Sequence, residues 1–511
     1  MAAKKKKGDS ENWHNNSKGK FSNFISEIIN TLKGDTEVSL NIKKVIVAFL
    51  SVTFFISLLI VAWIEGGRKR VLEFPDITIT SENKGCVDCH NVNTPGVVRQ
   101  WKESAHAGEG IGCYNCHRAE EGESDAYNHN GSWISTIVSP KDCATCHKTA
   151  ADQFAASHHA QAGTILGSLD NVLAEVVEGH VTRDANGNKT SESPVAVSGC
   201  MQCHGSEVKV LENGQLDPAT WPNTGIGRIN PDGSKGACSS CHMRHKFSIA
   251  QARQPESCGK CHMGPDHPHI EIYMESKHGI AFVANRTKMV EQMKEKQWWP
   301  GTDFESGPTC STCHMGATDK MDATHDVGAR ISWNLRPPVS AKIDTYPKKG
   351  DEGGEIKPWK DRRDDMKSVC RNCHSEQWVG NWYIQFDNFI GLYNDKFGTP
   401  ATKLYKFIRE KGLITSLVTF DDKIEFTYFY LWHHEGRRAR HGASMMGPDY
   451  AQWHGMYEVA ERFYQEFVPE LREIIEKNKR KGGSKRTSAL QAERMLSEIL
   501  NSPMHRWYLG K

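Results

Sequence analysis

The chain contains eight copies of the motif Cys-x-x-Cys-His, and together they account for all 16 of its cysteines. Each copy is typical of a c-type haem attachment site, in which the two thiols form thioether bonds and the adjacent histidine is the proximal iron ligand. Zinc ribbons or a disulfide framework would explain the cysteines, but neither requires a histidine directly after the second cysteine. The sequence therefore predicts eight c-type haems.

The eight motifs, numbered in chain order, supply two kinds of predicted haem contact. The haem-attaching cysteines are Cys86, Cys89, Cys113, Cys116, Cys143, Cys146, Cys200, Cys203, Cys238, Cys241, Cys258, Cys261, Cys310, Cys313, Cys370 and Cys373. The proximal iron ligands are His90, His117, His147, His204, His242, His262, His314 and His374.

The composition indicates what kind of fold these motifs belong to. Only 38% of the 511 residues are hydrophobic, which is little for a core of that size. Eight porphyrins would supply the missing apolar surface, so we expect a mainly α fold with little sheet in which the haems form the core. Helical periodicity at 378–397, 450–479 and 488–500 predicts a C-terminal region of long helices. We therefore expect an octahaem domain at 67–377 and a helical region at 378–511.

One segment bears on location. Residues 45–64 form an uncharged apolar run of 20 residues, long enough to cross a bilayer as a helix. A cleaved signal peptide is the alternative, but its apolar part is usually shorter and no small-residue cleavage site follows here. We predict an uncleaved transmembrane anchor at 43–66. The lysine excess before it places the N-terminus in the cytoplasm and the haem domain in the periplasm or an equivalent compartment.

The remaining N-terminal residues, 1–42, form the predicted cytoplasmic segment. Apolar residues at helical spacing between 21 and 32 predict a short amphipathic helix on the inner membrane surface. The net charge of +2 shows no strongly basic domain, and we expect no nucleic-acid partner.

Distal iron ligands are harder to assign. Eight of the 24 histidines are proximal and His14 precedes the anchor, which leaves 15 for at most eight positions. A pure electron carrier would use eight of them, whereas a catalytic cytochrome would leave one iron open. A repeat of aromatic, Ser at +3 and His at +5, unless it recurs by chance, favours three distal ligands: His106, His159 and His278. Further candidates are His129, His245, His325, His433, His434, His441 and His454.

Two strings resemble the octahaem hydroxylamine oxidoreductase family: GPDHPHIEIYMESKHG at 264–279 and RHGASMMGPDYAQWHG at 440–455. The resemblance covers roughly residues 80 to 475 and includes the number and order of the haem motifs. It implies that the fourth haem, on Cys200, Cys203 and His204, lacks a distal protein ligand and binds the substrate. It also implies that Asp266 and His267 are the acid–base pair of catalysis. From the residues alone, His267 or His269 could instead ligate a haem, and Asp266 could cap a helix.

The resemblance also concerns assembly and the direction of the reaction. It implies a homotrimer in which, in oxidative members, a tyrosine of a neighbouring subunit is cross-linked to the catalytic haem. Members without the link are reductases of nitrite or hydroxylamine. Tyr450 is the first candidate for this catalytic tyrosine and Tyr457 the second, with an ordinary packing role as the alternative.

The predicted function is that of a membrane-anchored octahaem oxidoreductase acting on small nitrogen compounds. Hydroxylamine oxidation is the first expectation and hydrazine a further substrate, with electrons passed to a cytochrome or a quinone-reactive membrane complex. The alternatives are a reductive enzyme, a non-catalytic electron conduit with every iron bound by two histidines, and a scaffold subunit that organises partners through its N-terminal segment.

Overall fold

The computed structural model describes residues 37–67, 77–165, 199–343, 357–414 and 420–511, with a few isolated positions between them. The chain divides into two compact units, Met1–Phe74 and Pro75–Lys511. The surface helix predicted at 21–32 lies outside the described ranges. The second unit contains every haem motif and the C-terminal helices, so the predicted boundary at 377/378 stays a prediction.

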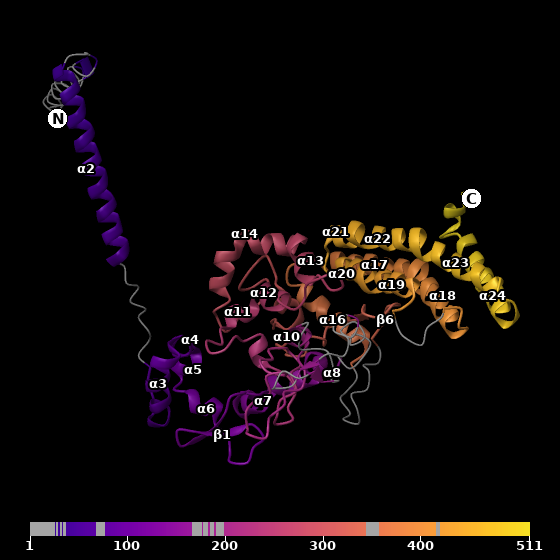
Figure 1. Cartoon of the computed structure of the whole chain (residues 1–511), viewed down its shortest axis with the longest axis horizontal. Helices are drawn as coiled ribbons and strands as arrows, with labels where there is room; N and C mark the ends of the chain where they lie inside the picture. Colours follow the sequence, from indigo (N-terminus) through magenta and orange to yellow (C-terminus); the bar gives the residue numbers. More distant parts are fainter. Residues whose placement is uncertain are drawn as a thin grey trace, which may run out of the picture. The chain divides into compact units, whose positions relative to one another are not determined.

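The described part of the first unit is one helix, α2 (Glu37–Gly67) (Figure 1). Its segment Asn41–Val61 has a mean hydropathy of 2.5, and none of it is buried. The hydroxyls of Thr53 and Ser57 donate to the carbonyls of Phe49 and Thr53, each at 2.9 Å, so these polar groups are satisfied inside the helix. The helix is long and apolar enough to cross a membrane. A signal sequence meets the same criteria, so the anchor itself stays a prediction.

Five of the eight haem motifs lie wholly within helix, and the other three begin in a helical element that ends before the motif histidine. The motif-bearing elements are α3 (Ser81–Asn93), α6 (Cys113–His117), α7 (Pro140–Ala156), α10 (Cys200–His204), η2 (Cys238–Ser240), α12 (Pro255–Gly259), α15 (Cys310–His314) and α16 (Trp359–Cys370). Residues at i, i+3 and i+4 share one face of a helix, so one turn presents both thiols and the imidazole in the same direction. This is the local reason why the motif can hold a planar group covalently and from one side.

Short elements connect these motifs. The helical ones are α4 (Pro95–Lys102), α5 (Ala105–Gly108), η1 (His159–Gln161), α8 (Ala162–Ile165), α11 (Ile249–Arg253), α13 (His269–Glu275) and α14 (Lys277–Gln292). The strands form three antiparallel pairs: β1 (Ala126–His129) with β2 (Ser132–Ser135), β3 (Thr182–Arg183) with β4 (Lys189–Thr190), and β5 (Trp333–Asn334) with β6 (Ala341–Lys342). The β1–β2 turn is Asn130-Gly131, both with positive φ, the usual sequence of a tight hairpin.

Long helices follow the last motif, as predicted. They are α17 (Glu376–Tyr393), η3 (Asn394–Gly398), α18 (Thr399–Glu410), α19 (Lys423–Phe429), η4 (Tyr430–Glu435), α20 (Gly436–Ser444), α21 (Pro448–Ala451), η5 (Gln452–Tyr457), α22 (Glu458–Glu461), η6 (Arg462–Phe467), α23 (Val468–Lys479), α24 (Gly483–Asn501) and η7 (Arg506–Leu509). The segments η3 to η6 are π-helical and join their neighbours into longer rods (Figure 1). The prediction of a mainly helical fold is confirmed.

The side-chain core lies among these C-terminal helices. Its most extensive cluster in the described residues is centred on Phe397, Leu404, Phe463, Phe467 and Leu471, each at most 2% exposed. The motif-bearing half has only small apolar clusters, such as that around Val87, Val98 and Trp101. The two halves are therefore built differently, with side chains filling the interior of one and a large cavity occupying the other.

Candidate haem centre and active site

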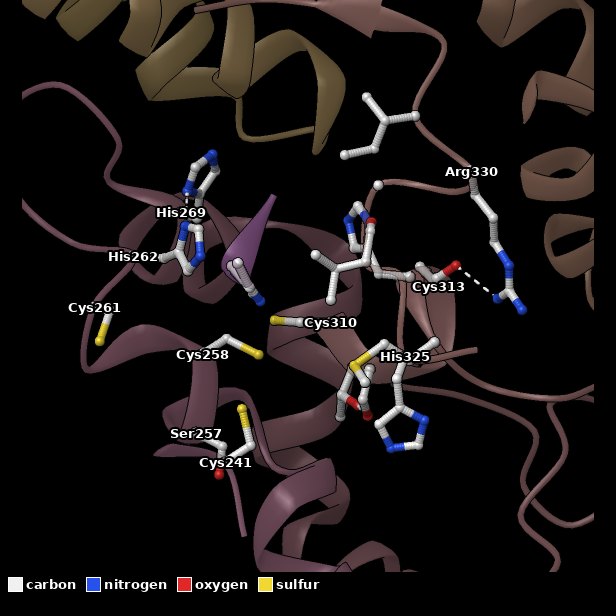
Figure 2. A pocket seen from close by; sticks show the side chains of 18 of the residues that line it. Cys241, Ser257, Cys258, Cys261, His262, His269, Cys310, Cys313, His325 and Arg330 are labelled. Atoms are coloured by element: carbon white, nitrogen blue, oxygen red, sulfur yellow. Dashed lines mark hydrogen bonds between the residues drawn. The ribbon is translucent and has the colours of Figure 1, made fainter. Parts of the chain in front are cut away.

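A single cavity of about 2270 Å³ runs through the motif-bearing half and is lined by residues of seven motifs, the second to the eighth. Pockets for drug-sized ligands are about 300–1,000 Å³, so this space exceeds the need of one small molecule. Figure 2 shows cysteines of the fifth, sixth and seventh motifs gathered around one part of it, with His262, His269 and His325 beside them. The volume and the repeated thiols fit a set of covalently attached haems.

The histidine rings provide a second test of fit. A bond from a metal to an imidazole nitrogen is about 2 Å, so two rings on opposite sides of one iron have centroids about 6 Å apart. Six motif histidines face another histidine at this separation: His90 and His129 (6.2 Å), His117 and His245 (6.3 Å), His147 and His106 (6.1 Å), His242 and His325 (6.4 Å), His262 and His159 (6.0 Å), and His374 and His278 (6.2 Å). The residues present therefore fit iron held between two imidazoles.

Hydrogen bonds orient the histidine rings, and burial keeps them in the neutral form that can bind a metal. The Nδ1–H of His117 donates to the Ser135 carbonyl at 2.8 Å, which leaves Nε2 as the nitrogen that can bind a metal. Burial lowers the pKa of His159, His242 and His245 to about 4, so these rings are neutral near pH 7. Neutral imidazole is the form that binds a metal.

The seventh motif is fastened by a buried arginine. Arg330 is 2% exposed and donates to the carbonyls of Cys313 at 3.0 Å and Gly316 at 2.7 Å, the first of which is drawn in Figure 2. His314, which ends the motif, donates from Nδ1 to the Val327 carbonyl at 3.3 Å. A side chain that binds two backbone oxygens holds the motif in place without occupying its haem-facing side.

Eight of the ten distal candidates fall into three groups, and the other two, His433 and His434, line the cavity from η4. His106, His129, His159, His245, His278 and His325 each face a motif histidine, as described above. His441 instead contacts His269, with ring centroids 4.3 Å apart. His454 is 54% exposed, contacts Glu458 at 3.0 Å, and has its ring against Tyr450. The structure gives no support for His454 as an iron ligand, because its position on η5 directs the side chain to solvent.

The facing pairs lead to a spectroscopic prediction. Replacing His129 by Ala is expected to convert the first haem from low spin to high spin, because the iron loses one of its two imidazoles. The electron paramagnetic resonance spectrum of the oxidised protein measures this. His454→Ala is the matched control and should leave every low-spin signal unchanged. Loss of a low-spin signal in the His454 variant instead of the His129 variant would contradict the assignment.

Asp266 and His267, which the family resemblance predicts to be the acid–base pair, lie in contact with each other. Nδ1 of His267 lies 2.5 Å from Oδ1 of Asp266, and Nε2 of His267 lies 3.1 Å from the carbonyl of Cys261. Because both ring nitrogens are engaged, His267 is a poorer ligand for the sixth haem than His159, although its ring is also 6.1 Å from His262. The Cys203 thiol lies close to the Cys261 thiol and to the charge of His267, so the Asp266–His267 pair lies where the fourth and sixth motifs meet.

A helical stripe faces this pair. His433 on η4 and Arg437 and His441 on α20 are spaced i, i+4 and i+8, which places them on one side of the continuous rod. Nη1 of Arg437 lies 3.1 Å from Oδ2 of Asp266 and 2.9 Å from Nε2 of His433. Our sequence reasoning considered the two histidines but missed Arg437. Its spacing of four residues from both was the available signal.

The charges around Asp266 act in one direction. Burial raises the pKa of this carboxyl, but the hydrogen bond with His267 and the charges of His267, His433 and Arg437 outweigh burial and hold the pKa well below its usual range. Burial acts to lower the pKa of His267, but the hydrogen bond and charge of Asp266 have the larger combined effect. The pKa of His267 is therefore raised above its ordinary value. A carboxylate that stays ionised beside a basic imidazole can take up and release a proton near neutral pH.

The two candidate tyrosines lie apart from the cavity of their own chain. The backbone N–H of Tyr450 donates to Oε1 of Glu275 at 3.2 Å, and Tyr450 is not among the residues that line the cavity. Tyr457 is 51% exposed and packs against Trp453, which is 60% exposed. A cross-link from either residue would therefore have to reach the haem of a neighbouring subunit, and it stays a prediction.

Comparisons with known proteins agree with this site. A family model described as "Seven times multi-haem cytochrome CxxCH" matches residues 231–419. A second, "Cytochrome c554 and c-prime", matches residues 68–118 and 142–227. Together the two matches support c-type haem attachment and a place among the multihaem cytochromes. More particularly, its relatives include proteins of the hydroxylamine oxidoreductase type.

One such relative is a probable nitrite reductase–hydroxylamine oxidoreductase fusion protein of Kuenenia stuttgartiensis, 26% identical over 339 residues. The match covers 60% of this chain but only 35% of that protein, so the chain corresponds to about a third of its length. A solved hypothetical multiheme protein superposes with a TM-score of 0.66 at 25% identity, covering 78% of this chain and 96% of that one. The reducing HAO-like protein complex of Kuenenia stuttgartiensis shares the fold, with a TM-score of 0.54 at 20% identity and coverage of 82% and 87%.

Proposed function

We propose that this protein is a membrane-anchored octahaem oxidoreductase that converts small nitrogen compounds at the fourth haem site. The observation that carries the proposal is the Asp266–His267 pair, which lines the same cavity as Cys200, Cys203 and His204. The haems, on the eight motifs, would supply iron to bind the substrate and a chain of centres to carry electrons. The six facing histidines are proposed as distal ligands, which assigns electron transfer to those haems.

The proposed role of the pair is proton transfer. Oxidation of hydroxylamine releases protons together with electrons, and reduction of nitrite consumes both. His267 would hold the proton that moves to or from the substrate, while Asp266 orients the imidazole through Nδ1 and stabilises its protonated form. The raised pKa of His267 favours its protonated form, which is the form that donates a proton to a substrate.

Location and partners belong to the same proposal. Helix α2 would anchor the protein, with its N-terminus in the cytoplasm and the haem unit across the membrane. The electron partner would then be a cytochrome or a quinone-reactive membrane complex, and a homotrimer would bring a tyrosine of one subunit to the haem of the next. The likeness to a solved HAO-like complex supports an assembly with other proteins.

Hydroxylamine oxidation, with hydrazine as a further substrate, remains the first reading of the direction. Reduction of nitrite or hydroxylamine is a second candidate. It is favoured because the relatives' names include nitrite reductase and a reducing complex.

Mass spectrometry of the haem peptides, combined with turnover assays in both directions, tests the proposal. A peptide with Cys200, Cys203, a haem and a linked tyrosine, together with hydroxylamine oxidation, would support the first direction. Ordinary haem peptides with nitrite or hydroxylamine reduction would support the second. Turnover in neither direction, with every haem low spin, would reject the enzyme and leave an electron conduit.

A further inference from the structure

We infer that Arg437 is a substrate-binding residue of this site and gives it a preference for anionic nitrogen compounds, of which nitrite is the simplest. The inference rests on the proposed function, because it assumes that substrate binds beside Asp266 and His267. It adds to that function the chemical class of substrate and the residue that selects it.

The first support is the position of the guanidinium. Arg437 lines the cavity together with Asp266, His267 and the fourth motif. Oδ1 of Asp266 faces His267 and Oδ2 faces Nη1 of Arg437, so the carboxylate joins the arginine to the acid–base imidazole. The positive charge of Arg437 therefore acts on a substrate that binds beside His267.

The second support is that the guanidinium is held in place. Nε of Arg437 donates to the Arg336 carbonyl at 2.8 Å, and the guanidinium lies 5.1 Å from the centre of the Trp432 ring. Its side chain is 14% exposed. An arginine fixed by backbone, ring and carboxylate loses little freedom when it binds a ligand, which makes it effective in recognising planar oxyanions.

The third support is the charge of the whole cluster. Arg437 carries a permanent positive charge, and Asp266 is the acidic side chain that the hydrogen bonds place against it. When His267 also holds a proton, the three groups together are positive. Opposite charge favours binding of an anion such as nitrite, while neutral hydroxylamine gains much less from it.

The experiment compares Arg437→Gln and Arg437→Lys in the full-length holoprotein, with Arg438→Gln as the matched control. Arg438 is the next residue on α20, but it pairs with Glu458 rather than with Asp266. Sodium nitrite and hydroxylamine are titrated separately into the oxidised protein, and the haem absorption spectrum reports each dissociation constant. Haem content and melting temperature of every variant verify that it is folded.

Arg437→Gln is expected to weaken nitrite binding by about tenfold or more and hydroxylamine binding by less than about threefold. Arg437→Lys should retain part of the nitrite affinity because it keeps the charge, and Arg438→Gln should change neither ligand. Equal losses for nitrite and hydroxylamine would overturn the inference and reduce Arg437 to a positioning role. If the unaltered protein responds to neither ligand, the proposed function fails and this inference fails with it.

Discussion

Replacing Asp266 by Asn is expected to lower turnover of a nitrogen substrate by about 10²- to 10³-fold while the protein keeps all its haems. The amide is close in shape to the carboxylate, but it carries no negative charge. It therefore makes a weaker hydrogen bond with His267 and does not neutralise the charges of His433 and Arg437. The imidazole would lose both its orientation and its raised pKa. Steady-state kinetics with hydroxylamine and with nitrite, alongside haem quantification, measure the effect.

The control for this variant is Asp152→Asn, the same chemical change on α7. Asp152 is 63% exposed and pairs with Lys148 at 2.9 Å, so its loss should leave turnover within about twofold. If Asp266→Asn retained full turnover with normal haem content, Asp266 and His267 would not be the acid–base pair, whatever the direction of the reaction.

Removing the sixth haem is expected to prevent accumulation of folded protein, whereas removing the first haem is expected to be tolerated. Cys258 and Cys261 line the shared cavity, while the first motif does not and its Cys89 is exposed. A haem-sized void of roughly 500 Å³ would cost on the order of 10 kcal/mol at about 24 cal/mol per Å³. That is comparable with the whole stability of a typical domain.

The two double variants Cys258→Ala/Cys261→Ala and Cys86→Ala/Cys89→Ala make this comparison with the same chemical change. Intact mass counts the haems, and thermal unfolding measures stability. The first-motif variant should yield folded protein with seven haems. Stable seven-haem protein from the sixth-motif variant would show that the cavity does not depend on that haem for its structure.

The local parts of the site could be predicted from the sequence because their signals are local. A haem motif contains its own cysteines and proximal histidine within one helical turn, and the Asp266–His267 pair consists of neighbours in the chain. A short repeat predicted His106, His159 and His278 as distal ligands, and each of them faces a motif histidine in the structure. In each case the residues that act together are also close in sequence.

The remaining features depend on contacts between distant segments. His245 faces His117 and His325 faces His242 only because segments distant in the chain come together, and no short pattern marks these pairs. His454 has the residue type of a ligand but lies on the solvent side of η5. Arg437 follows the π-helical segment η4 and contacts Asp266, which is the basis of its proposed role in substrate binding. Sequence periodicity alone does not distinguish a π-helical segment from an ordinary α-helix.

The most direct test of the central claim is to count high-spin haems in the oxidised protein with and without substrate, using electron paramagnetic resonance and absorption spectroscopy. We predict that the fourth haem is high spin and that its signal changes when nitrite or hydroxylamine is added. The six haems whose motif histidines face a second histidine should be low spin. A spectrum of eight low-spin haems that responds to neither compound would contradict the proposed enzyme and identify the protein as an electron carrier.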